Sequence, residues 1–217
     1  MIEYPKIETL YDRDVSTFKV MPDNLRMAEF GIIKSWYVTE KVDGTNVRVM
    51  WSAENQKLIF GGRTDNAQMP VTLMQHLSDT FKPEMFFEFD TDVILFGEGY
   101  GEKIQKGGGN YRKGVGFRLF DILIGKWWME PDNVHNIADK FNIKTVPVVD
   151  VITDLPKSYE DLANIVGLES SVAQEDDGAG LQPEGIVARS IPLLFCRNSM
   201  RLMWKLKYRD FQNGKTS

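Results

Sequence analysis

Cysteine is almost absent from this sequence of 217 residues, in which Cys196 is the only one. A single cysteine allows no disulfide within the chain and no zinc site built on cysteine ligands. Apolar runs are also short, far below the roughly 20 residues that a membrane-spanning helix needs. The N-terminus mixes acids and bases where a secretory signal would be apolar. We therefore expect a soluble, intracellular protein of the cytoplasm that has no membrane partner.

An excess of positive charge is missing as well. The net charge is −5 at pH 7, which argues against a uniformly basic nucleic-acid-binding surface. Two stretches are nevertheless basic. Residues 103–118 contain lysine and arginine but no acidic residue, and residues 197–217 contain one acidic residue, Asp210. Each stretch is either an ordinary solvated face or a surface that follows a nucleic-acid backbone.

Repeats and low-complexity tracts are also missing. A chain of this length predicts one domain over residues 1–217, or at most two small ones.

Amphipathic segments that begin at Pro70, Pro131 and Ser158 predict three helices, the last ending at Gly167. Residues 106–114 and 174–183 are expected to be mobile loops. Segments rich in β-branched and aromatic residues predict strands at 35–41, 46–51, 57–61, 93–97, 116–124, 184–189 and 201–208. This order predicts an α+β fold with mostly antiparallel sheet.

Lys41 stands at the end of a predicted strand in TEKVDGTNVRVMW, two residues before Asp43-Gly44. An Asp-Gly pair between alternating apolar residues predicts a β-hairpin, in which Lys41 would be an ordinary solvated residue. Lys41 can instead be a nucleophile. That role requires surroundings that lower the pKa of the amine, because at the usual pKa of about 10.4 very little of it is neutral at pH 7.

Lys205 and Lys207 lie two residues apart in a predicted strand. The period of a strand places both on one face, with Trp204, Leu206 and Tyr208 facing the core. Two adjacent ammonium groups suit a phosphate group, although a half-exposed strand with outward lysines has the same pattern.

Two carboxylates follow or begin predicted strands. Glu98 comes after an apolar run, between Gly97 and Gly99, and a carboxylate buried there needs a partner such as a ribose hydroxyl or a metal ion. Glu184 begins a strand and is a plausible ligand for Mg²⁺, which proteins often hold through one or two carboxylates plus substrate phosphates. Each is otherwise a solvated acid near a turn.

Three further residues suit a nucleotide. Arg63 follows two glycines, where it could contact a ribose or a phosphate. Phe120 and Asp121 are neighbours in a predicted strand, so we expect them to point to opposite faces, one toward the core and one toward a groove. A phenylalanine in a groove can stack on a base, but a phenylalanine in a strand is more often part of the core.

Six short motifs occur in one order along the chain: EKVDGTN, GGRT, LFGEGYG, FRLFDI, PEGIVAR and WKLK. They resemble the nucleotidyltransferase motifs of ATP-dependent ligases and mRNA capping enzymes. The closest resemblance is to the phage-type double-strand RNA ligases, the RNA ligase 2 family, whose first motif is Glu-Lys-x-(His or Asp)-Gly-Thr-Asn. The tract Lys103-Ile104-Gln105-Lys106 also resembles the Gly-Ile-Gln-Lys tract of that family.

The resemblance implies an antiparallel-sheet nucleotidyltransferase (adenylation) domain of the ATP-grasp-like ligase type. Family members typically continue into a C-terminal domain, and DNA ligases and capping enzymes into an OB fold, whereas in this sequence we expect no C-terminal OB or helical domain. Its cofactors would be ATP and Mg²⁺ (or Mn²⁺). Lys41 would form lysyl-AMP, and Lys205 and Lys207 would hold the α-phosphate as further catalytic residues. Glu184 would bind the metal. The implied nucleotide-binding residues are Glu40, Asp43, Asn46, Arg63, Glu98, Phe120, Asp121, Glu184, Lys205 and Lys207, with Arg63 and Glu98 on the ribose and Phe120 on the adenine.

The implied partner is RNA with a 5′-phosphate and a 3′-hydroxyl, either in a nicked duplex or single-stranded, and the oligomeric state stays open. The alternatives are a DNA ligase, a GTP-using capping-type nucleotidyltransferase, and an RNA-end-binding module without catalysis. Asp43 does not decide the sugar, because many RNA ligases have His there and DNA ligases have Asp. Thr45-Asn46 and the Ile104-Gln105-Lys106 tract favour an RNA ligase.

Overall fold

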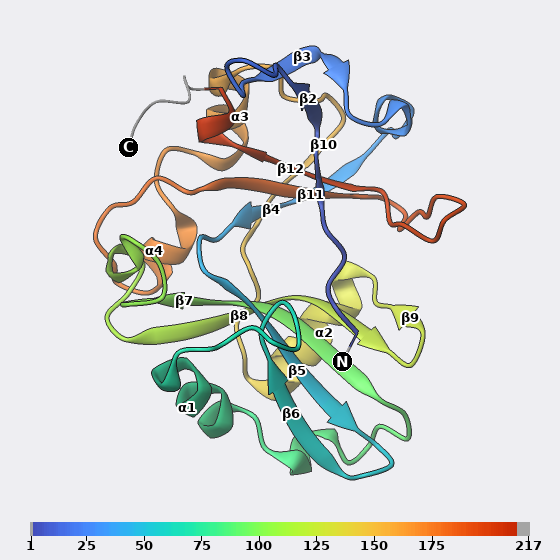
Figure 1. Cartoon of the computed structure of the whole chain (residues 1–217), viewed down its shortest axis with the longest axis vertical. Helices are drawn as coiled ribbons and strands as arrows, with labels where there is room; N and C mark the ends of the chain where they lie inside the picture. Colours follow the sequence, from blue (N-terminus) through green and yellow to red (C-terminus); the bar gives the residue numbers. More distant parts are fainter. Residues whose placement is uncertain (1, 212–217) are drawn as a thin grey trace. The chain divides into compact units, whose positions relative to one another are not determined.

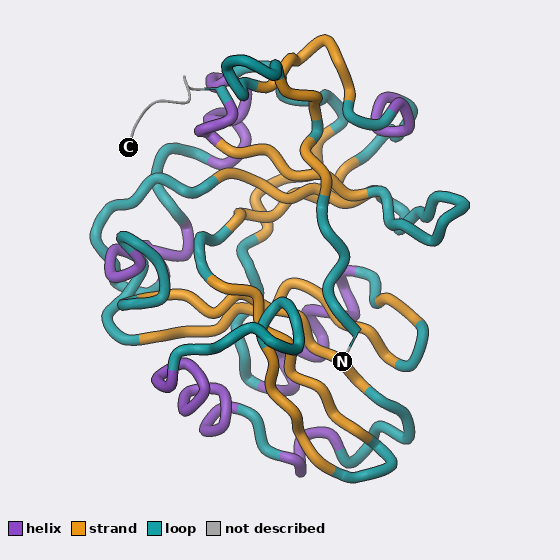
Figure 2. Tube along the Cα trace, viewed as in Figure 1, coloured by secondary structure: helices purple, strands orange, loops and turns teal. Residues whose placement is uncertain are grey.

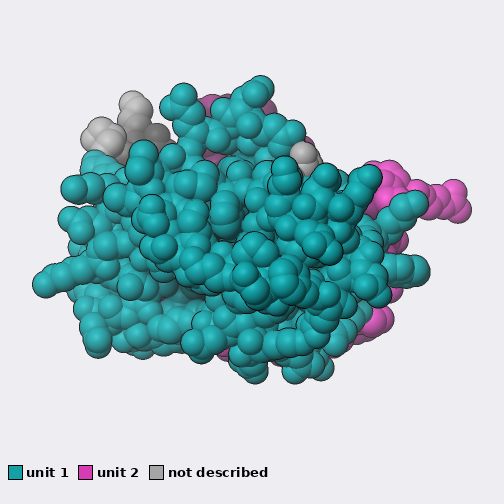
Figure 3. All heavy atoms as spheres, turned by 90° about the horizontal axis from the view of Figure 1, so that it is seen from below, with its two compact units in different colours: residues 1–4, 43–146, 173–179 teal, residues 5–42, 147–172, 180–217 magenta. Residues whose placement is uncertain are grey.

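The computed structural model describes residues 2–211, and these divide into two compact units (Figure 3). Unit 1 comprises residues 2–4, 43–146 and 173–179, and unit 2 comprises residues 5–42, 147–172 and 180–211. The chain passes repeatedly from one unit to the other, so neither is one continuous stretch of sequence. Within residues 2–211, no helix has both the length and the apolar composition that crossing a membrane requires.

Unit 1 is built on a five-stranded antiparallel sheet (Figure 1). Its strands, in spatial order, are β6 (Lys57–Gly61), β5 (Thr45–Ser52), β7 (Val93–Gly101), β8 (Val115–Ile124) and β9 (Trp127–Trp128). The helices α1 (Val71–Thr80) and α2 (Pro131–Phe141) both contact β8. Two short 3-10 helices, η2 (Pro83–Phe86) and η3 (Gly108–Asn110), complete the unit.

The core of unit 1 follows directly from the strand period. Val47, Val49 and Trp51 alternate along β5 and are buried with Leu73 and Leu77 of α1 in one apolar cluster. The other face of the sheet therefore receives the polar residues that alternate with them.

Unit 2 is built on a second five-stranded sheet, coloured as strand in Figure 2. In spatial order its strands are β1 (Glu8–Thr9), β12 (Met203–Lys207), β11 (Gly185–Ser190), β4 (Trp36–Lys41) and β10 (Val148–Ile152). Only the short β1 pairs in parallel. A separate hairpin joins β2 (Tyr11–Arg13) to β3 (Val20–Leu25), and two 3-10 helices are η1 (Ala28–Gly31) and η4 (Tyr208–Asp210).

The helix α3 (Tyr159–Val166) packs against β10 and β11 of this sheet. Ser158 caps it by accepting the N–H of Asp161 at 3.0 Å, and Gly167 ends it at a φ of +77°. Trp36 and Trp204 meet edge to face at 5.6 Å in the core below the sheet. The short α4 (Ser171–Glu175) spans the change from unit 2 to unit 1.

The predicted α+β class with antiparallel sheet is confirmed, and each predicted strand and helix corresponds to an observed one. Six observed elements were not predicted: β1, β2, β3, β9, β10 and α4. These are short, and β3 contains Pro22, Asp23 and Asn24, which are poor strand formers. The two-residue β1 is a strand through its pairing with the distant β12, and β3 through its hairpin with β2. β10 has the sequence Val148-Val149-Asp150-Val151-Ile152, in which local propensity does favour a strand, so this strand could have been predicted.

Both stretches predicted to be mobile loops contain buried side chains. Residues 106–114 include η3 and Tyr111, which is 2% exposed. Residues 174–183 begin with the end of α4 and Asp176, whose side chain is 3% exposed. Glycine and polar composition concealed these anchors, because the groups that bury them come from elsewhere in the chain.

Candidate active site

Three charged side chains meet at the ends of adjacent strands in unit 2. Lys41 is the last residue of β4, Lys207 is the last residue of β12, and Glu184 immediately precedes β11, which lies between those two strands. Lys41 Nζ lies 2.5 Å from Glu184 Oε2, and Lys207 Nζ donates to Glu184 Oε1. One carboxylate therefore bridges two lysines that are 166 residues apart in sequence.

Gly185 allows the three strands to meet in this way. It pairs with Lys41 on one side and with Lys207 on the other. A Cβ atom at this position would lie 2.1 Å from the Leu206 carbonyl oxygen, and the φ of +154° also favours glycine. The glycine of the PEGIVAR motif is thus a packing requirement next to the charged cluster.

The cluster is only partly open to solvent. The side chains of Lys41, Glu184 and Lys207 are 22%, 14% and 13% exposed. Burial by itself would raise the pKa of Glu184, but the positive charges and hydrogen bonds of Lys41 and Lys207 outweigh it and lower this pKa. The carboxylate is therefore ionised at neutral pH.

Lys205 shares a face with Lys207, as the strand period predicts. Its register partners are Val187 of β11 and Thr9 of β1. The alternate residues Trp204 and Leu206 are fully buried in the core of unit 2. The face of the sheet opposite this core therefore presents the two lysines of β12 and Lys41 of β4.

A hollow of about 640 Å³ in unit 2 extends this face. Two of its arginines are paired, Arg13 with Asp210 at 2.6 Å and Arg26 with Asp12 at 2.8 Å. Lysine and arginine side chains around a hollow suit phosphate oxygens. The acids Glu8 and Asp12 also line the hollow, but its basic residues outnumber them: Lys6, Arg13, Arg26, Lys205, Lys207 and Arg209.

Glu40 lies on the other face of β4 from Lys41. It is 1% exposed and accepts hydrogen bonds from the Ser170 hydroxyl and, at 2.8 Å, from the Ser171 N–H. Neighbouring residues of a strand point to opposite faces, so the structure does not bring the Glu40 carboxylate to the lysine cluster. Its observed contacts hold the first residue of α4.

The remaining predicted residues belong to unit 1. Asn46 of β5 and Glu98 of β7 are register partners, and both are half-buried on the sheet face opposite α1 and α2. Asp43 is exposed at the turn before β5. Arg63 is exposed after β6, and the segment that carries it is held by Arg48.

Arg48 is not among the site residues predicted from the sequence. It is fully buried, with its Nε donating to the Gly62 carbonyl at 2.6 Å and its guanidinium 2.9 Å from Asp65. These contacts lie on both sides of Arg63. A basic residue between two apolar residues of a strand was a signal, but its burial depended on a loop that the sequence does not place.

The expectation that Phe120 and Asp121 point to opposite faces is wrong, because β8 has a bulge. Phe96 pairs with Asp121 and the next residue, Gly97, pairs with Leu119, so Phe120 is the extra residue. The Tyr4 hydroxyl donates to Asp121 Oδ2 at 2.8 Å, and the Tyr4 ring lies 5.0 Å from the Phe120 ring. Both neighbours thus interact with Tyr4, a residue with no local sequence signal.

The family model described as RNA ligase matches residues 34–207. This chain belongs to the RNA ligase family. The resemblance inferred from the six motifs is thereby confirmed. A comparison with curated proteins gave no match.

Solved structures of an RNA ligase from Naegleria gruberi share the fold. A mutant with ATP and Mn has a TM-score of 0.63 and 20% identity, over 94% of this chain and 57% of that chain. A second mutant with ATP and Mn has a TM-score of 0.64 and 18% identity, over 95% and 56%. A mutant with AMP and Mn has a TM-score of 0.62 and 18% identity, over 94% and 61%. This RNA ligase family member thus spans little more than half the length of these solved chains.

Glu184 is also the residue of this RNA ligase family member that suits a divalent cation. Within residues 2–211, no three His, Cys, Asp or Glu side chains are grouped as a metal-binding cluster. A single ionised carboxylate next to two lysines fits Mg²⁺, which commonly takes one or two carboxylates and completes its shell with substrate phosphates and water.

The predicted basic surfaces are only partly exposed. Arg118 is 1% exposed and paired with Glu175 at 2.7 Å and Asp176 at 3.2 Å. Arg201 is also buried, and Lys215 lies outside the described residues. Arg118 and Arg201 therefore do not belong to a solvated basic face.

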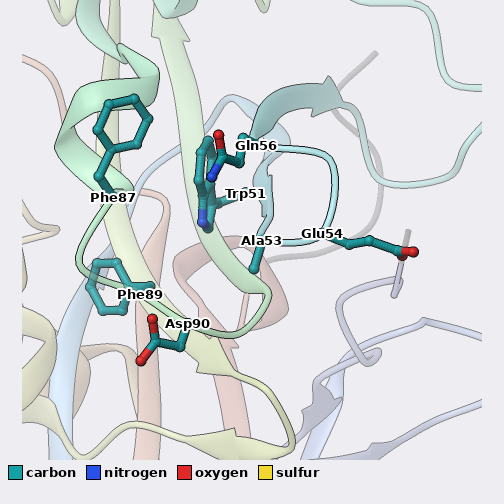
Figure 4. Close-up of a pocket in the computed structure, with 7 residues that line it drawn as sticks. All are labelled: Trp51, Ala53, Glu54, Gln56, Phe87, Phe89 and Asp90. Carbon is teal, nitrogen blue, oxygen red and sulfur yellow. The ribbon is translucent and has the colours of Figure 1, made fainter.

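Another hollow, of about 630 Å³, lies in unit 1 beside Trp51, Phe87, Phe89 and Asp90 (Figure 4). It contains none of the predicted site residues and no basic side chain among those that line it. Its aromatic and acidic lining does not suit the phosphate chemistry of an RNA ligase.

Proposed function

We propose that this chain is the nucleotidyltransferase part of an ATP-dependent RNA ligase. The observation that carries the proposal is the cluster of Lys41, Glu184 and Lys207, in which the motif lysine lies beside a carboxylate and a second lysine. Membership of the RNA ligase family supports it, as do the fold-related Naegleria gruberi structures with ATP and AMP.

In the first step, Lys41 Nζ attacks the α-phosphorus of ATP. An N–P bond forms, the bond from the α-phosphorus to the bridging oxygen breaks, and pyrophosphate leaves. The amine must be neutral when it attacks, so Lys41 must first leave its ion pair with Glu184 and give up one proton to solvent. A second proton leaves the nitrogen for solvent as the N–P bond forms. The product is lysyl-AMP.

Lys205 and Lys207 would contact the α-phosphate during this transfer. Negative charge spreads over the phosphoryl oxygens in the transition state, and fixed positive groups stabilise it. Their common face and the basic hollow beside them support this role.

The nucleoside would be held by residues of unit 1. We assign the ribose to Arg63 and Glu98, the adenine ring to Phe120, and supporting roles to Asp43, Asn46 and Asp121. The half-buried Phe120 ring and the fully buried Asp121 beside it support a stacking platform with a fixed edge. Glu40 would act indirectly, through the segment that begins at Ser170.

Mg²⁺ or Mn²⁺, when bound, would be held by Glu184 and would neutralise charge on the ATP phosphates. The ionised state of Glu184 suits this assignment, because carboxylate oxygens are the ligands that both ions accept.

The later steps act on RNA. The 5′-phosphate of one RNA end would attack lysyl-AMP, which frees Lys41 and leaves AMP on the RNA. The 3′-hydroxyl of the other end would then attack the activated 5′-phosphate, forming the phosphodiester and releasing AMP. The exposed residues Lys103, Lys106 and Lys113 of unit 1 would contact the RNA backbone.

Both units contribute residues to these roles, so we further propose that residues 1–217 act as one adenylation domain of the ATP-grasp-like ligase type. An intracellular location would follow from an RNA substrate and a single cysteine.

The test is transfer of label from nucleotide to protein. We would incubate the wild-type chain, Lys41→Ala and Lys57→Ala with Mg²⁺ and α-labelled ATP, GTP or labelled NAD⁺, then denature the protein and measure bound label. Lys57 is an exposed lysine on β6 and serves as the matched control. We expect label from ATP in the wild type and Lys57→Ala, and none in Lys41→Ala. Label from GTP would indicate a capping-type enzyme, and no label in folded protein would overturn the proposal.

The substrate is tested next with matched nicked duplexes and single strands. Sealing of a 5′-phosphorylated RNA nick, with a slower reaction on the same nick in DNA, is the expected result. Equal or faster sealing of DNA would contradict the assignment of RNA.

A further inference from the structure

The turn that follows Lys41 is held by one loop of unit 1, residues 102–114. The Asp43 N–H donates to the Tyr111 hydroxyl at 3.1 Å, and the Gln105 side-chain amide donates to the Gly44 carbonyl at 3.0 Å. The two bonds engage consecutive residues, and their partners lie more than 60 residues further along the chain. A turn held at two consecutive residues keeps few of its alternative backbone conformations.

The turn also lies close to the sheet. A Cβ atom at Gly44 would be 2.2 Å from the Gly99 carbonyl oxygen of β7. Because glycine alone allows this approach, the turn is held against β7 on one side and by the loop through its hydrogen bonds.

The loop is well suited to hold another segment. Glu102 N–H donates to Gly114 O at 2.7 Å and closes its base, and Tyr111 N–H donates to Gly108 O at 3.0 Å. Gly108 packs against the Gly101 carbonyl, where a Cβ atom would be 2.0 Å away. Tyr111 is therefore fixed in its backbone as well as buried.

A buried polar network lies behind Tyr111. The Tyr111 and Tyr100 rings meet edge to face at 5.9 Å. The Tyr100 hydroxyl donates to Asp176, which also binds Arg118 at 3.2 Å and Lys144 at 2.6 Å. The Tyr111 ring thus packs against Tyr100, whose hydroxyl belongs to a network of charge-assisted hydrogen bonds that holds it in place.

We propose that Tyr111 and Gln105 are positioning residues for Lys41, a role that rests on the proposed function. Each acts through the backbone of Asp43 or Gly44, which is joined to Lys41 by the buried Val42. Attack on phosphorus requires the amine to stand in line with the leaving group, and a displacement of about 1 Å can cost roughly 100-fold in rate. The loop that carries the family's Ile-Gln-Lys tract therefore sets the direction from which Lys41 attacks.

Tyr111→Phe tests the proposal, because it removes the hydroxyl acceptor and keeps the ring. Tyr159→Phe is the control: the Tyr159 hydroxyl also accepts a hydrogen bond, in this case from the Gln182 side-chain amide, but Tyr159 lies on α3. Gln105→Leu removes the second bond at an exposed position, so one test survives even if Tyr111→Phe does not fold. For each protein we would measure single-turnover formation of protein-AMP at increasing ATP concentrations, and hydrogen exchange of the Asp43 amide.

We expect Tyr111→Phe and Gln105→Leu to lower the saturating rate by roughly 10-fold or more, with little change in the ATP concentration that gives half of that rate. Exchange of the Asp43 amide should rise in Tyr111→Phe, and Tyr159→Phe should match the wild type. Wild-type saturating rates in both loop variants would overturn the inference. The absence of protein-AMP in the wild type would instead reject the proposed function, so the two failures can be told apart.

Discussion

Lys41 Nζ lies 2.5 Å from Glu184 Oε2, and the second oxygen of the same carboxylate accepts a hydrogen bond from Lys207. The proposed nucleophile is thus held by the proposed metal ligand. A reaction that needs a neutral amine and a metal-bound carboxylate needs both groups released from each other. The ionisation of Glu184 and its contacts with the two lysines therefore affect both the stability of unit 2 and the proposed reaction of Lys41.

Glu184→Gln should destabilise the protein and abolish rapid adenylylation. The amide cannot neutralise Lys41 and Lys207, so two ammonium groups remain close together without their counter-charge. We expect the free energy of unfolding at pH 7 to fall by about 1–3 kcal/mol, measured by urea denaturation, with the exposed Glu54→Gln as the control.

The same variant has a pH dependence of known sign. The pKa of Glu184 is lowered in the folded protein, so its contribution to stability is present above its ordinary pKa. It is lost as the pH falls through the folded value. The gap in unfolding free energy between wild type and Glu184→Gln should therefore narrow from pH 7 toward pH 3. A gap of constant size would contradict the ion pairing.

Gly185→Ala should be strongly destabilising, because the added Cβ would lie 2.1 Å from the Leu206 carbonyl oxygen. A backbone atom cannot move aside as a flexible side chain can, and β11 would separate from β12. We expect a loss of about 2 kcal/mol or more. The control is Gly180→Ala, where an added Cβ meets no atom within 4 Å, and a change within about 0.5 kcal/mol is expected there. Equal unfolding midpoints for the two variants would refute the packing argument.

Asp176→Asn should weaken unit 1, because Asp176 neutralises the fully buried Arg118 together with Glu175. Removing one partner from a buried ion pair typically costs about 3–5 kcal/mol, and the exposed Glu175 and Lys144 place the expected loss near the lower end. The neighbouring Asp177→Asn is the control, since Asp177 is exposed and its φ of +54° suits asparagine.

Burial tends to raise the pKa of Asp176, but Lys144, Tyr100 and Arg118 together lower it. Its contribution is therefore present above the ordinary pKa of an aspartate and lost as the pH falls through the folded value. Thermal unfolding of wild type and Asp176→Asn should converge in acid. Divergence toward low pH would show that another group dominates the network.

Tyr11→Phe and Tyr208→Phe should have opposite effects. The Tyr11 hydroxyl is buried with no hydrogen-bond partner in the described part of the chain, whereas the Tyr208 hydroxyl donates to the Gly167 carbonyl. Losing the first should leave stability unchanged or raise it by up to about 1 kcal/mol, and losing the second should lower it by about 1 kcal/mol. Urea denaturation at pH 8 compares the two.

The unfolding free energies of Tyr11→Phe and Tyr208→Phe can also be compared with that of the wild type at alkaline pH. Burial raises the pKa of both tyrosines to about 12, so their contribution is fully present below the ordinary tyrosine value. It is lost as the pH rises toward 12. Each phenylalanine variant should lose less stability than the wild type between pH 9 and pH 11.5. A parallel decline in all three proteins would exclude these tyrosines as the cause.

Much of the fold could be predicted because the informative patterns are local. The alternation in β5 and β12, the proline at the start of α2 and the Ser158–Asp161 cap of α3 each act within a few residues. The same holds for Lys205 and Lys207, whose common face follows from a spacing of two. The bulge at Phe120 broke this reasoning, because it exists only in relation to β7.

The sequence by itself determined the class of fold, the family and the types of residue available for nucleotide chemistry, since these depend on short-range periodicity and on motif order. The tertiary structure decided which of those residues interact. Glu184 lies between Lys41 and Lys207, and Glu40 points away from them. Arg118 is buried, and Tyr111 and Gln105 form hydrogen bonds with the turn after Lys41. Each of these relationships joins residues far apart in the chain, and such pairs are chosen by strand pairing and burial rather than by local propensity.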